Sequence, residues 1–120
     1  MLNVVVIQSA VRLGGGQIVR RVVSVNEIVG YDPSSDSFSF IEVFRWDPIS
    51  DVFEFVGDKN SYLLESRVAP KLGIPAHRVR EVYDELDRRV NILKQLSASG
   101  VTNFYELYKV LSKAEREGLV

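Results

Sequence analysis

The chain has 120 residues, a length that fits one domain, residues 1–120, with a single hydrophobic core. Hydrophobic residues make up 46% and charged residues 26%, which excludes the disordered and fibrous classes. A net charge of -1 gives no general attraction for nucleic acid, so we expect no nucleic-acid partner. There is no cysteine and no apolar run long enough to cross a bilayer. We therefore expect a cytoplasmic protein whose membrane contact, if it has any, is peripheral.

The first predicted element is a strand at the N-terminus. Residues 2–7 form a short, nearly continuous apolar run rich in valine, which is typical of a strand covered on both faces in the middle of a sheet. Gly14, Gly15 and Gly16 then predict a turn or loop. A buried strand separated from its sheet exposes unpaired backbone edges, so we expect a homo-oligomer.

Three further strands are predicted at about residues 17–31, 37–46 and 52–57, as an antiparallel meander. A turn motif lies between these strands in two copies, which begin at Tyr31 and at Trp46. Each copy has an aromatic residue followed by Asp, Pro, any residue, Ser and Asp. Asp accepts hydrogen bonds from the backbone that follows it, and Pro presets φ for the second turn position. Each copy of the turn motif therefore predicts a chain reversal. Gly30 suggests a bend within the first of these strands.

Helical periodicity begins after residue 60. We predict helices at about residues 61–70, 75–98 and 103–116, with Pro70 ending or kinking the first. Pro75 suits the first turn of the second helix, and Asn103 with Glu106 resembles a capping box for the third. Strands followed by helices indicate the α+β class.

The sequence has no phosphate-binding loop, because the three glycines precede a strand-like run and no Lys-Ser or Lys-Thr pair follows them. His77 is the only histidine, which argues against the common general base and against most zinc sites. We predict no catalytic residue and no metal ligand in this chain.

Arg20 and Arg21 are the candidate site residues. Neighbouring residues of a strand point to opposite faces, and an apolar strand is a costly place for two permanent charges. One interpretation is an outward arginine beside one that pairs with a carboxylate such as Glu27 or Glu42. The other is that one guanidinium contacts a nucleotide phosphate or a subunit interface in a larger assembly.

Two stretches of the sequence resemble a known family: residues 20–33, RRVVSVNEIVGYDP, and residues 43–48, VFRWDP. With the strand at 53–57 and the helical tail, they resemble the archaeal branch of the type II/IV secretion ATPases, which power pili, the archaellum and related secretion machines. The resemblance implies the C-terminal portion of a RecA-like motor domain, whose parent protein binds ATP and Mg.

The family's phosphate-binding loop, Asp-box, acidic magnesium motif and histidine box have no counterparts in these 120 residues. We therefore expect no bound cofactor and no autonomous ATP hydrolysis, and a structural role in the motor. The implied partners are the remainder of the ATPase, neighbouring subunits of its hexameric ring and a membrane platform protein. The alternative is a free-standing adaptor or regulatory module that docks on such a motor or platform.

Overall fold

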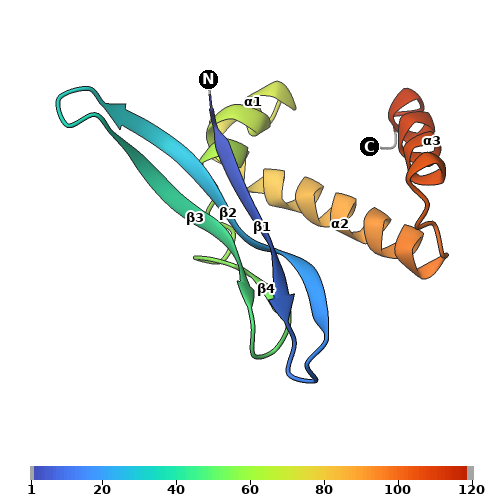
Figure 1. Cartoon of the computed structure of the whole chain (residues 1–120). Coiled ribbons are helices and arrows are strands. Elements are labelled where there is room, and N and C mark those ends of the chain that lie inside the picture. The colour runs from blue at the N-terminus through green and yellow to red at the C-terminus, as the bar shows by residue number, and fades with distance from the viewer. Residues whose placement is uncertain (1, 119–120) are drawn as a thin grey trace.

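The computed structural model describes residues 2–118 as a four-stranded antiparallel sheet followed by helices, which confirms the α+β class. The strands are β1 (Val4–Arg12), β2 (Ile18–Asp32), β3 (Ser37–Asp47) and β4 (Val52–Phe55), in the spatial order β1-β2-β3-β4. The three strands predicted as a meander are β2, β3 and β4. Figure 1 shows the strands as a long twisted sheet with the helices on one side of it.

The N-terminal strand is present, but its predicted place in the middle of a sheet is wrong. β1 is an edge strand paired with β2 alone, and Val4, Val6 and Ile7 are 39%, 55% and 49% exposed. A short apolar run does not distinguish a central strand from an edge strand whose apolar side chains are exposed. The glycines form a tight hairpin turn between β1 and β2, in which Gly16 has a φ of 83° and donates to the carbonyl of Leu13 at 2.8 Å.

Three helical segments follow, close to their predicted bounds. The first runs through a π-helical turn, η1 (Leu64–Val68), into the short α1 (Ala69–Lys71). The second combines the 3₁₀ segment η2 (Ala76–Glu81) with α2 (Val82–Ala98), and the third is α3 (Phe104–Arg116). The wider π turn lies directly before Pro70, where it relieves the clash of the proline ring with the carbonyl four residues earlier.

The Asn103 half of the predicted capping box is present at the start of α3, but no bond from the Asn103 N–H to the Glu106 carboxylate is found among residues 2–118. The Oδ1 atom of Asn103 accepts hydrogen bonds from the backbone N–H of Tyr105 at 2.9 Å and of Glu106 at 3.3 Å. These bonds satisfy two of the amides that lack a partner in the first turn of any helix.

The hydrophobic core is small and lies where the end of the sheet meets the helices. Ala69, Val82 and Tyr83 are buried together, and Phe55 of β4 packs on them with its ring centroid 5.9 Å from that of Tyr83. Val43 and Trp46 are buried separately in β3. Among residues 2–118 only these five hydrophobic residues are buried, whereas twenty large hydrophobic residues are exposed.

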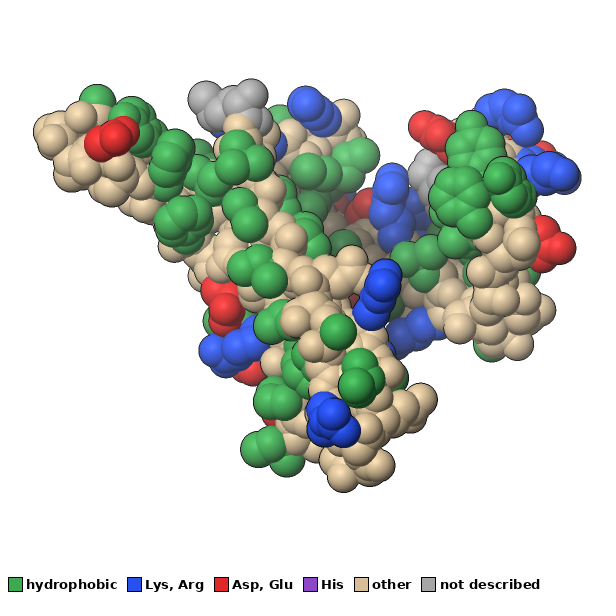
Figure 2. All heavy atoms as spheres, viewed as in Figure 1, with side chains coloured by type: hydrophobic (Ala, Val, Ile, Leu, Met, Phe, Trp, Pro, Cys, Tyr) green, Lys and Arg blue, Asp and Glu red, His purple; other side chains and the backbone are tan. Residues whose placement is uncertain are grey.

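The molecule is also extended. Its radius of gyration is 17.1 Å, where a compact domain of this length would have about 14 Å. Figure 1 shows α2 leading away from the sheet and α3 standing at its far end. Figure 2 shows hydrophobic side chains on the visible face of the strands and on α3.

The accessible surface measures this openness. It is 8909 Å², whereas a monomeric protein of 13.6 kDa exposes about 6,600 Å². The excess of about 2,300 Å² is what one partner contributes to a large, permanent interface. The fold therefore exposes far more surface than a self-sufficient domain of this size, and twenty large hydrophobic residues contribute to it.

Candidate interaction site

The structure separates the two candidate arginines. Arg20 is exposed on β2, opposite Ala10 of β1, and its guanidinium has no hydrogen-bond or ion-pair partner among residues 2–118. Arg21 points away from it and donates from Nε and Nη2 to the two carboxylate oxygens of Asp51, at 2.8 and 2.9 Å. One outward arginine and one paired arginine is the arrangement of the first interpretation, but the carboxylate is that of Asp51 and not that of Glu27 or Glu42.

Asp51 organises the turn between β3 and β4. It has a φ of 52°, in the left-handed region, and its Oδ1 also accepts from the indole N–H of Trp46 at 2.7 Å. The hydrogen bonds from Arg21 and then from Trp46 lower the pKa of Asp51 to about 2. Arg21 is therefore a fixed support of this turn, and Arg20 is the arginine that is available to a partner.

The turn between β2 and β3 is built on the same plan. The hydroxyl of Tyr31 donates to Asp36, which has the same φ of 52° as Asp51. Asp32 accepts from the backbone N–H of Ser34 at 2.9 Å, as Asp47 accepts from that of Ile49 at 2.9 Å. The turn motif is thus stabilised by a second hydrogen bond, because the polar group of its aromatic residue donates to its last aspartate.

A buried polar network joins the sheet to the helices, and local sequence patterns do not predict it. Glu27 of β2 is 5% exposed, and its Oε1 accepts from the backbone N–H of Leu63 at 3.0 Å. Its Oε2 accepts from the hydroxyl of Ser61, which is fully buried and itself accepts from the N–H of Leu64 at 3.1 Å. Glu27 therefore holds the start of the first helix against the sheet with the charge that a helix N-terminus favours.

Tyr83 of α2 extends this network. Its hydroxyl accepts from the backbone N–H of Ser61 at 2.8 Å and donates to Oε2 of Glu65 at 2.6 Å. Burial, and then the hydrogen bond to Glu65, raises the pKa of Tyr83 to about 12. The chain of contacts Glu27, Ser61, Tyr83, Glu65 thus connects β2, the first helix and α2.

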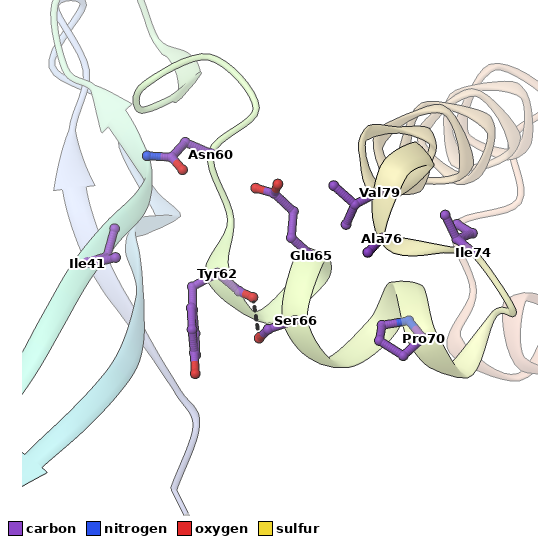
Figure 3. Close-up of a pocket in the computed structure, with 9 residues that line it drawn as sticks. All are labelled: Ile41, Asn60, Tyr62, Glu65, Ser66, Pro70, Ile74, Ala76 and Val79. Atoms are coloured by element: carbon purple, nitrogen blue, oxygen red, sulfur yellow. Dashed lines mark hydrogen bonds between the residues drawn. The ribbon is translucent and has the colours of Figure 1, made fainter.

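A groove opens beside this network, between β3 and the helices. Its volume is about 630 Å³, and Figure 3 shows Ile41 on the sheet side facing Val79 and Ile74 on the helical side. Glu65 extends into the space between them and is the charged residue among those that line it. The groove is therefore apolar, with one carboxylate.

The described part of the chain offers little else for chemistry. Among residues 2–118 there is no group of three or more His, Cys, Asp or Glu side chains that could hold a metal ion. His77 lies exposed in η2. None of the described helices has the length and apolar character needed to cross a membrane.

Two proteins of Methanocaldococcus jannaschii are similar to this chain. Uncharacterized protein MJ0900 is 36% identical over 118 residues, which is 98% of this chain and 21% of that protein. Uncharacterized protein MJ1287 is 42% identical over 94 residues, which is 78% of this chain and 32% of that protein. The chain thus spans about a fifth and a third of the length of these relatives. No family model matches it.

Proposed function

We propose that this chain is a structural and interaction segment of a type II/IV secretion ATPase, which packs against the rest of the motor and does not hydrolyse ATP alone. The observation that carries the interaction role is the excess of about 2,300 Å² of exposed surface for a chain of this mass. An isolated domain that left so much surface and twenty large hydrophobic residues in water would lose a large part of the stabilisation that burial provides.

The motor itself is inferred from the resemblance of residues 20–33 and 43–48 to that family. The first of these stretches forms β2 and the start of the turn after it, and the second forms the end of β3 and the start of the turn that Arg21 and Asp51 support. In this proposal the parent protein is cytoplasmic and supplies ATP and Mg, and a membrane platform protein receives the motor. Arg20 is the candidate for contact with a neighbouring subunit or a nucleotide phosphate, because its guanidinium is exposed and has no partner among the described residues.

Two calorimetric titrations test the proposal. The chain should bind the separately produced, phosphate-loop-containing portion of a secretion ATPase from the same organism, and it should not bind Mg-ATP by itself. Micromolar, magnesium-dependent ATP binding by the isolated chain would overturn the structural role. Failure to bind the phosphate-loop portion would overturn the assignment to the motor.

A third titration separates this proposal from the adaptor alternative. An intact motor already contains its own copy of the segment, so the isolated chain should not bind it. An adaptor has its own docking surface on the complete motor, and it would bind the intact protein as well as the truncated one. Binding to the intact motor would therefore replace the segment hypothesis with the adaptor.

A further inference from the structure

The groove beside Glu65 differs from the other exposed apolar surfaces because it contains a carboxylate without a cation. Oε2 of Glu65 accepts the hydrogen bond from Tyr83, and no Lys or Arg of residues 2–118 forms an ion pair with Glu65. Around it the groove is lined by apolar side chains that include Ile41 of β3, Val79 of η2 and Ile74 in the loop before η2.

A second carboxylate adds to the negative charge behind the groove. Glu27 is linked to Glu65 through Ser61 and Tyr83, and it too forms no ion pair within the described part of the chain. The cation nearest this network by its recorded contacts is Arg80, whose guanidinium carbon lies 5.2 Å from the centroid of the Tyr83 ring.

Other carboxylates of the helices are neutralised by ion pairs with neighbouring arginines. Glu81 pairs with Arg78, and Glu85 pairs with Arg88 and Arg89. Glu65 has no such partner among residues 2–118, and the groove that it lines contains no Lys or Arg. Glu115 lines the groove between α2 and α3, but Arg89 lines that groove as well.

We propose that this groove binds a segment of a partner protein that presents a lysine or arginine side chain flanked by apolar residues. The alkyl part of such a side chain would lie along Ile41 and Val79, while its cationic end would bond to the remaining oxygen of Glu65. An anionic side chain would be repelled by Glu65, and a neutral one would leave Glu65 without the ion pair that binding makes possible. The inference rests on the proposed function, because it describes the chemistry of one partner segment.

The test uses three small probes that share an apolar chain and differ in charge: hexylammonium, hexanol and hexanoate. Each is titrated into the complete chain, and backbone amide shifts are followed by NMR. Hexylammonium should produce saturable shifts around Ile41 and residues 62–66, hexanol should bind more weakly at the same place, and hexanoate should bind least.

The variants are Glu65→Gln and, as a matched control, Glu115→Gln, which borders a different groove between α2 and α3. Glutamine keeps an acceptor for Tyr83 and nearly the same volume, and an unchanged amide spectrum away from residue 65 will show that the fold is intact. E65Q should weaken hexylammonium binding roughly tenfold and remove its preference over hexanol, because a charge-assisted hydrogen bond is lost. E115Q should bind like the wild type.

Equal affinity for the three probes, or unchanged hexylammonium binding in E65Q, would overturn the inference. That failure is distinct from a failure of the proposed function, which is measured by binding to the phosphate-loop portion of the motor. A chain that prefers hexylammonium but does not bind the motor portion keeps the groove chemistry and loses the proposed parent.

Discussion

Ser61→Ala should destabilise the fold more than any exposed serine substitution, because it removes the atom that joins the sheet to the first helix. Its hydroxyl donates to Glu27 and accepts from the N–H of Leu64, and the residue is fully buried. Losing a hydrogen bond to a charged group costs about 1.5–3 kcal/mol, and losing the bond to the helix N-terminus costs about 1 kcal/mol. We expect a total loss of about 3 kcal/mol.

Urea denaturation measures this loss. With a slope of about 1.5 kcal/mol per molar urea, the midpoint should fall by about 2 M. Fluorescence of Trp46, the single tryptophan, reports on the sheet, and far-ultraviolet circular dichroism reports on the helices. Both should move together if the network couples the two parts into one cooperative unit.

Two further variants make the reasoning refutable. Ser66→Ala lies in the same helix, where the hydroxyl donates only to the carbonyl of Tyr62 at 2.6 Å and the residue is exposed, so its effect should stay within about 0.5 kcal/mol. Tyr83→Phe should be destabilising, and in the double variant with S61A the two effects should fall short of their sum, since both residues share one network. An S61A midpoint equal to that of S66A would refute the coupling.

Two other predictions concern the turn at Asp51 and the edge at β1. The folded pKa of Asp51, about 2, lies below the ordinary value of about 3.9, so its interactions stabilise the fold above about pH 4 and are lost as the pH falls toward 2. Melting temperatures from pH 5 to pH 2 should therefore fall less steeply in Asp51→Asn than in the wild type, and parallel curves for the two proteins would contradict the assignment. For the edge, sedimentation velocity should find self-association that Val6→Lys reduces, because a lysine disfavours strand addition, and a strictly monomeric wild type would exclude it.

The strands, turns and caps were predictable because local residues determine them. The two turns require only an aspartate that bonds to the backbone two residues later and another that tolerates a positive φ, and both lie within six residues of each aromatic. The cap at Asn103 likewise depends on amides two and three residues away. The separation of Arg20 from Arg21 also follows from the alternation of a single strand.

The faces of the sheet were less predictable, because a β-bulge changes the alternation. Phe40 and Phe44 have the same parity in the sequence, yet Phe44 pairs with Val25 and Phe40 pairs with Ile28, three residues further along β2. The extra residue in β3 between these pairs places the two phenylalanines on opposite faces. Phe44 consequently packs on Phe55 with ring centroids 4.3 Å apart, whereas Phe40 is 60% exposed.

The network at Glu27 could not be predicted from local sequence patterns, because its hydrogen bonds join residues far apart in the chain. Its hydrogen bond to Ser61 spans 34 residues, and that between Ser61 and Tyr83 spans 22. A periodicity argument assigns Tyr83 to an apolar stripe and Ser61 to a helix start, and both assignments hold without bringing the two together. The one available sign was a glutamate inside a strand rich in valine and isoleucine, where a charge is costly unless it is paired or fully hydrogen-bonded.

The small core and the polar network together explain how an open chain can still have one defined shape. Five buried hydrophobic residues provide limited stabilisation, but a saturated hydrogen-bond network fixes the angle between the sheet and the first helix. Other angles would leave Glu27 or Ser61 without partners. The apolar surface of β1 and the groove at Glu65 are then held in a fixed relation to each other. A partner that covers them binds only the folded form, so its binding free energy adds to the stability of the fold. Preformed geometry reduces the ordering cost of that association.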